Sequence, residues 1–126
     1  MNSDQYLQQL LEPGIILIRS LKDIEADADM VHALHIRNLQ LSNGEPFVVL
    51  LDVSKADFQI NDEAIKLLAS PEFLAKRMAT AIIVESLAAR IIGNFFKRIQ
   101  ATKRPVKLFN NEEEAIVWLR GISRAE

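Results

Sequence analysis

The residues that could carry chemistry are few, and most are polar side chains that follow short apolar runs. Asp52 and Ser54 follow one run, Ser86 follows another, and Asn61 precedes a helical pattern. Polar groups beside the free N–H groups of a helix N-terminus can bind a small anion, to which Arg90 would add positive charge. We take these five residues as candidates for binding a ligand or partner. The alternative is that Asp52 orders its loop and Ser86 caps its helix.

No residue pattern predicts catalysis, a cofactor or a metal site. The chain has no cysteine, which excludes disulfides, thiolate nucleophiles and cysteine-ligated metals. His32 and His35 would share one face of a helix, but the only obvious further ligands are Asp27 and Asp29. We expect both histidines to be solvated on a surface helix. A Gly-x-Ser-x-Gly motif is also absent, so we expect no serine hydrolase and no enzyme.

A second group of candidates lies in a predicted helix at residues 86–99. Gly93 inside that helix costs about 1 kcal/mol relative to alanine, which the close approach of another surface would explain. Ala89, Gly93 and Phe96 form a stripe beside the main apolar face, and Lys97 borders it with charge. We predict that these residues mediate self-association as a homodimer. The alternative is that Phe96 packs within its own domain.

Composition favours one small globular domain. The chain has 126 residues, of which 49% are hydrophobic and 25% charged, and a net charge of -2. We expect a single domain over residues 1–126, with a core at about 14–121. The slight acidity argues against nucleic acid as a partner, and a basic cluster at positions 97, 98, 103 and 104 should complement the end of a helix and stay solvated. No stretch predicts a membrane span or signal peptide, so we expect a cytoplasmic protein without integral membrane association.

Glycine and proline mark the boundaries of the predicted elements. Apolar runs at 15–18, 47–51, 79–84 and 106–109 predict strands, and residues 5–11 predict the first arm of a hairpin that turns at 12–14. Helices are predicted at 27–41, after Asn61, after Ser70, at 86–99, and from Asn111 to a stop at Gly121. The alternation predicts an α/β sandwich.

Two groups of motifs resemble known families. Leu50-Leu-Asp-Val-Ser-Lys-Ala-Asp-Phe58, followed by the helix after Asn61, is similar to STAS domains, the fold of the anti-sigma-factor antagonist SpoIIAA. Arg90-Ile-Ile-Gly-Asn-Phe-Phe96 and Glu112-Glu-Glu-Ala-Ile-Val-Trp-Leu119 resemble small uncharacterised bacterial proteins called SpoIIAA-like or STAS/SEC14-like. The similarity spans residues 14–119. It implies a mostly parallel sheet of 4 to 5 strands with an N-terminal hairpin and about 4 flanking helices.

The resemblance also implies a function. It indicates a non-catalytic interaction or regulatory module, and the SEC14-like relatives indicate, as the alternative, a carrier or sensor of a small apolar or anionic ligand. STAS antagonists carry a phosphorylatable hydroxyl where this chain reads Ile60-Asn-Asp-Glu63, so we expect no phosphorylation switch. A carrier would place an apolar pocket beside Phe95, Phe96 and Trp118. Otherwise we expect Trp118 in the core.

Overall fold

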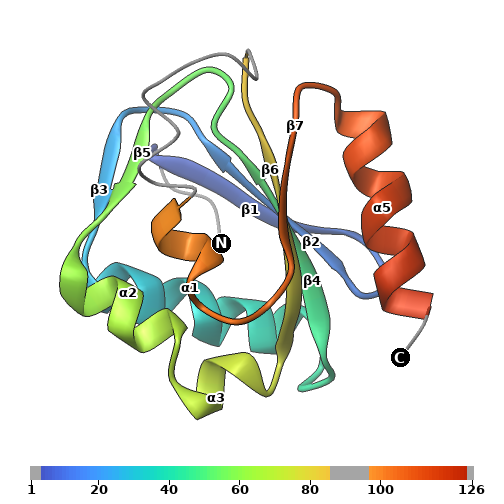
Figure 1. The fold of residues 1–126 in the computed structure, drawn as a ribbon, viewed down its shortest axis with the longest axis horizontal. Coiled ribbons are helices and arrows are strands. Elements are labelled where there is room, and N and C mark those ends of the chain that lie inside the picture. Colours follow the sequence, from blue (N-terminus) through green and yellow to red (C-terminus); the bar gives the residue numbers. More distant parts are fainter. Residues whose placement is uncertain (1–3, 86–96, 125–126) are drawn as a thin grey trace.

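A five-stranded sheet in the order β1-β2-β4-β6-β7 forms the centre of the computed structural model, which describes residues 4–85 and 97–124 (Figure 1). Four strands are parallel, and the N-terminal strand is antiparallel to its neighbour. This arrangement confirms the predicted hairpin and mostly parallel sheet. The strands are β1 (Tyr6–Glu12), β2 (Ile15–Ser20), β4 (Phe47–Asp52), β6 (Arg77–Ile83) and β7 (Val106–Phe109).

The chain reverses between β1 and β2 at a turn that contains Gly14. Gly14 has a φ of 85°, a left-handed conformation that glycine adopts without a steric penalty. All six residues of β4 are buried, because helices cover both faces of the sheet. Continuous apolar runs, rather than alternating ones, are therefore what this architecture requires.

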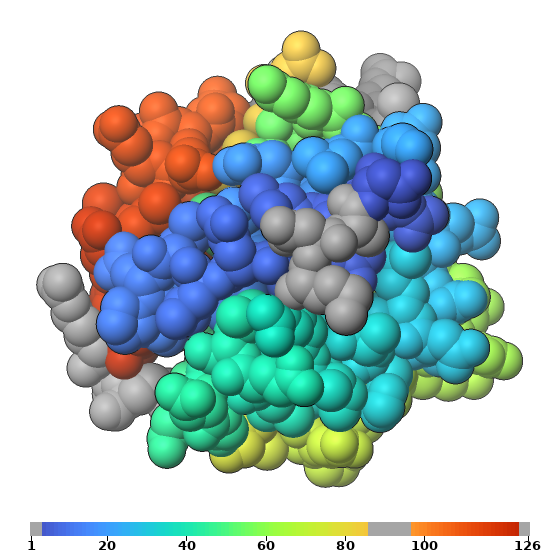
Figure 2. Space-filling model, turned by 180° about the vertical axis from the view of Figure 1, so that it is seen from behind, coloured from blue at the N-terminus to red at the C-terminus, as the bar shows by residue number. Residues whose placement is uncertain are grey.

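The helices divide the core into two parts. The helices α1 (Ala28–Leu41), α2 (Asp62–Leu68) and α3 (Pro71–Leu74) cover one face of the sheet, and α5 (Glu112–Arg124) covers the other (Figure 1). Residues 97–100 are also helical. Seen from behind, β1 crosses the surface between α5 and α1 (Figure 2). We call the buried cluster beneath α1, α2 and α3 the α1-side core, and the cluster beneath α5 the α5-side core.

A second, two-stranded sheet was not predicted. Its parallel strands are β3 (Ile24–Ala26) and β5 (Phe58–Ile60), which lead into α1 and α2 respectively. The backbone N–H of Ile24 donates to the carbonyl of Asp57 at 2.9 Å, and the N–H of Asp57 donates to the carboxylate of Asp23 at 2.9 Å. Strands of three residues are too short to show a hydrophobic period, so the sequence pattern did not reveal them.

Capping residues behave largely as their types predict. Asp27, Asn61 and Asn111 each accept a hydrogen bond from a backbone N–H three residues later, at 2.9 to 3.1 Å. Ser70 precedes α3 as predicted, but its hydroxyl donates to the carbonyl of Leu67 at 2.7 Å instead of capping α3.

The prediction that the last helix stops at Gly121 is wrong, because α5 continues to Arg124. Gly121 is exposed, and Ile122 beyond it packs against the α5-side core. That contact outweighs the helix penalty of glycine, which is about 1 kcal/mol. In the described part of the chain, no helix combines the length and apolarity needed to cross a membrane.

Candidate functional site

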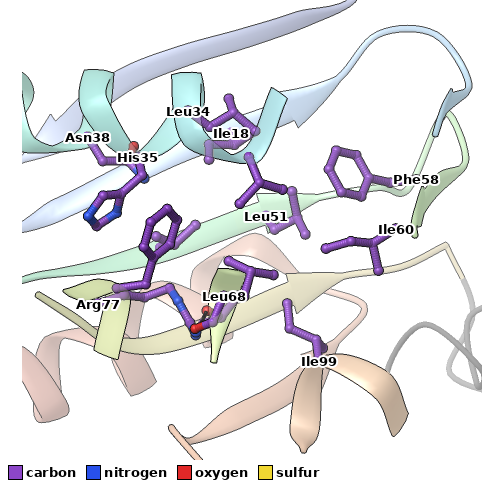
Figure 3. A pocket seen from close by; sticks show the side chains of 14 residues that line it. Ile18, Leu34, His35, Asn38, Leu51, Phe58, Ile60, Leu68, Arg77 and Ile99 are labelled. Carbon is purple, nitrogen blue, oxygen red and sulfur yellow. Dashed lines mark hydrogen bonds between the residues drawn. The ribbon is translucent and has the colours of Figure 1, made fainter. Parts of the chain in front are cut away.

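A cavity of about 70 Å³ lies in the α1-side core, between the sheet and the layer formed by α1, α2 and α3. A water-sized sphere takes about 10–15 Å³, so there is room for roughly five of them. Figure 3 shows the lining side chains, with the polar ones His35, Asn38 and Arg77 in one half of the view and Phe58, Ile60 and Ile99 in the other. Most of the remaining wall is aliphatic, including Ile18, Leu51 and Leu68. We call this space the core cavity.

Arg77 is the charged residue of this wall, and it is only 5% exposed. Its Nη2 donates to the carbonyl of Leu68 at 3.0 Å and to the hydroxyl of Thr102 at 3.3 Å, and its Nη1 reaches the hydroxyl of Thr80 at 3.4 Å. Its Nε is buried and has no hydrogen-bond partner among the described residues. A guanidinium can donate five hydrogen bonds, so the present contacts leave part of its capacity unused.

No carboxylate in the described part of the chain forms an ion pair with Arg77. Residues 86–96 contain no Asp or Glu that could supply one. Burial, and secondarily the positive charge of Arg104, lower the pKa of Arg77 to about 10. The guanidinium therefore remains protonated near neutral pH without a compensating negative charge.

His35 lies in the same wall and is 4% exposed, whereas His32 is exposed. The expectation that both histidines are solvated is therefore wrong for His35. Its ring stacks on Phe73, with ring centroids 3.8 Å apart, and its Nε2 has no partner in the described structure. Burial lowers the pKa of His35, Arg77 and His32 lower it further, and Glu72 opposes the shift. The imidazole is consequently neutral near pH 7.

Asn38, the third polar residue of the wall, is tied to the N-terminal strand. Gln8 is 3% exposed, and its side-chain amide donates to Asn38 Oδ1 at 2.7 Å and to the carbonyl of Leu34 at 2.9 Å. These two bonds join β1 to α1 inside the molecule. Asn38 thus has a structural partner, while His35 and Arg77 each retain an unpartnered nitrogen.

Asp52 and Ser54 meet at the carboxyl end of β4, where they form a closed group with Arg19. Asp52 accepts hydrogen bonds from the Ser54 hydroxyl at 2.6 Å, from the Ser54 N–H at 3.0 Å and from Arg19 Nε at 2.8 Å. Burial alone would raise the pKa of Asp52, but the bonds from Ser54 and Arg19 outweigh it and leave the pKa below its ordinary value. Arg19, which the sequence analysis missed, also pairs with Glu112 at 3.0 Å. The geometry shows the loop-ordering role of Asp52, and its ligand-binding role stays a prediction.

The other candidates are not gathered into this group. Asn61 acts as the N-cap of α2. Lys97 is exposed. The remaining candidates lie outside the described residues, so their roles stay predictions; they are Ser86, Ala89, Arg90, Gly93 and Phe96.

The expectation that the basic cluster stays solvated is wrong for two of its members, Arg98 and Arg104. Arg98 donates to the carbonyl of Ile60 at 2.8 Å and pairs with Asp62, and Arg104 donates to the carbonyl of Leu74 at 2.9 Å. Both arginines therefore tie the segment after residue 96 to neighbouring elements.

The core cavity does not lie beside Trp118, because Trp118 packs on the α5-side core across the sheet. Phe95 and Phe96 of the pocket predicted beside Trp118 lie outside the described residues, so that pocket stays a prediction. The indole lies 5.8 Å from the ring of Phe109. Trp118 is partly buried there, in agreement with the expected core position. Among residues 4–85 and 97–124, no group of His, Asp and Glu could hold a metal ion.

Comparison with known proteins identifies the fold. No curated protein matches the chain. The structure is similar to that of an uncharacterised protein of the DUF3478 family with a SpoIIAA-like fold from Shewanella loihica PV-4, with a TM-score of 0.61 and 15% identity over 94% of this chain and 98% of that chain. The chain thus has a SpoIIAA-like fold. The sequence pattern of the family described as Domain of unknown function (DUF7793) matches residues 9–123, and the chain belongs to that family.

Proposed function

We propose that the chain is a non-catalytic STAS-like module that binds a small molecule in the core cavity, as a carrier or sensor. The observation that supports this is an unfilled, partly open pocket of about 70 Å³ that reaches into the α1-side core. Protein interiors are packed to the density of organic crystals and contain few voids larger than a water molecule. A void of this size beside polar groups without partners is therefore a candidate binding site.

The size of the cavity limits the ligand to a few heavy atoms unless the walls move. Drug-sized ligands occupy pockets of about 300–1,000 Å³, and a cavity of about 150 Å³ is needed for benzene. The core cavity is smaller than either, at about 70 Å³. It suits a short aliphatic molecule or one end of a longer one.

Xenon is a suitable first probe, because it enters apolar cavities without requiring any polar contact. Leu50 and Leu51 are adjacent in β4 but face different cores, and only Leu51 lines the cavity. In methyl NMR spectra under xenon pressure, we expect shifts at Leu51 and Ile18 and none at Leu50. Leu51→Phe should weaken the xenon response, while the matched control Leu50→Phe should leave it unchanged. Equal shifts on both sides of the sheet would refute the proposal.

A role toward a protein partner remains a separate prediction. The SpoIIAA-like fold supports an interaction module, but most residues of the predicted homodimer interface lie outside the described part of the chain. Native mass spectrometry of freshly purified protein tests both roles, since it reports a retained ligand as well as the oligomeric state.

A further inference from the structure

Arg77 is a buried cation that forms no ion pair with any carboxylate in residues 4–85 and 97–124. Desolvating a charge is costly, and proteins normally compensate it with an opposite charge or a full set of hydrogen bonds. The acceptors around Arg77 are one carbonyl and two hydroxyls, which are dipoles and do not neutralise it. Arg104 adds positive charge nearby. A complete site would therefore include an anion.

The chemistry of the wall restricts that anion. The guanidinium supplies one positive charge to the wall, and the imidazole of His35 beside it is neutral. Arg77 Nε and His35 Nε2 are both buried and have no hydrogen-bond partner among the described residues. The rest of the wall is aliphatic. A ligand with one negatively charged group and a short apolar tail matches this wall, which has a polar part and an aliphatic part. A phosphate dianion would bring more charge than Arg77 compensates and more oxygen atoms than the wall has donors.

We propose that the core cavity binds a small aliphatic carboxylate, with its carboxylate on the guanidinium of Arg77 and its tail against Ile18, Leu51 and Ile60. This assignment rests on the proposed function, because it specifies the ligand of the same cavity. Charge-assisted hydrogen bonds to guanidinium are among the stronger ones in proteins, so Arg77 would determine both affinity and orientation.

Propionate and propionamide provide a matched test on the wild-type protein, because they have the same number of heavy atoms and differ in charge. We expect propionate to bind at least tenfold more tightly, and to shift the ¹⁵Nε–¹Hε resonance of Arg77. Equal affinities, or tighter binding of inorganic phosphate, would overturn the assignment. If xenon enters the cavity and propionate does not bind, the carboxylate assignment fails alone. If xenon is also excluded, the proposed function fails with it.

Arg77→Met should weaken propionate binding about 10- to 100-fold and change propionamide binding less than threefold. Arg104→Met is the matched control, because Arg104 lies outside the cavity wall and donates to the carbonyl of Leu74. Because the charge of Arg104 acts on the site only from a distance, Arg104→Met should weaken propionate binding much less than Arg77→Met does and leave propionamide binding unchanged. Should Arg77→Met fail to fold, Arg77→Lys keeps the charge but lacks the Nε–H, and we expect a smaller loss of propionate affinity. Wild-type affinity for propionate in either Arg77 variant would refute the proposal.

Discussion

Replacing Leu51 with phenylalanine tests whether the core cavity can accommodate additional side-chain atoms. Leu51 is 5% exposed, pairs with Ile18 and Ile82 on the neighbouring strands, and points into the cavity. Phenylalanine carries three more side-chain carbon atoms than leucine. Leu50→Phe makes the same change one residue earlier, where the side chain is 0% exposed and faces the α5-side core.

The expected effects have opposite signs. A coefficient of about 24 cal/mol per Å³ of cavity, applied to the 70 Å³ here, limits the gain from filling the space to about 1.7 kcal/mol. Because a flat ring fills only part of the space, we expect Leu51→Phe to raise the free energy of unfolding by about 0.5–1 kcal/mol. Leu50→Phe overpacks a filled core and should lower it by about 1–3 kcal/mol.

Urea unfolding followed by the fluorescence of Trp118, the only tryptophan, measures both changes. With a slope of about 1–3 kcal/mol per molar urea, the two variants should differ in midpoint by about 0.5 M or more. The result that would refute the reasoning is a loss of stability in Leu51→Phe equal to that in Leu50→Phe. The space would then be unavailable to added carbon atoms, and a ligand could not use it without moving the walls.

Four further predictions concern single residues. Gln8→Leu should lower the free energy of unfolding by about 1–3 kcal/mol, because it leaves buried acceptors on α1 without a donor; a change below about 0.5 kcal/mol in urea unfolding would contradict this. The pKa of Asp52 is lowered from 3.8 in the folded state, so its stabilising contribution should be lost as pH falls below about 3.8, and Asp52→Asn should reduce that acid sensitivity. The pKa of His35 is lowered from 6.5, so unfolding takes up a proton and stability should fall as pH decreases below about 6.5; a His35→Phe variant with the same slope would argue against this assignment. Phe96→Asp should yield a folded monomer if the predicted interface exists, as measured by light scattering, and an unfolded chain would place Phe96 in the core instead.

Much of the fold could be predicted because its strands are bounded by strong turn signals. Gly14 precedes a continuous apolar run, which is typical of a sheet covered on both faces, and Pro105 precedes the short run Val106–Phe109, which Lys107 interrupts. The short strands β3 and β5 carried no such signal. The N-caps Asp27 and Asn61 could be predicted because their side chains bond to backbone groups only three residues away.

The polar part of the cavity wall could not be predicted, because the burial of its residues depends on contacts with segments that are distant in the sequence. The apolar residues of α1 do not form one stripe, and the structure explains this by the inward positions of His35 and Asn38. Arg77 begins a strand, where a charged residue is typical of a solvent-exposed end. Only the packing of α2 and of the segment around Thr102 against it shows that it is buried.

The two faces of the sheet differ in the polarity of the side chains buried against them. Both receive alternate side chains from β4, yet the buried cluster of the α5-side core consists of apolar residues such as Phe109 and Leu119. The α1-side core instead encloses His35, Asn38 and Arg77 around unfilled space. Selection for stability alone favours apolar filling of such a space, because an uncompensated buried charge lowers stability. The buried charge of Arg77, at the start of β6, therefore supports the proposed binding site, and we expect substitutions on the α5 side to change stability without changing ligand affinity.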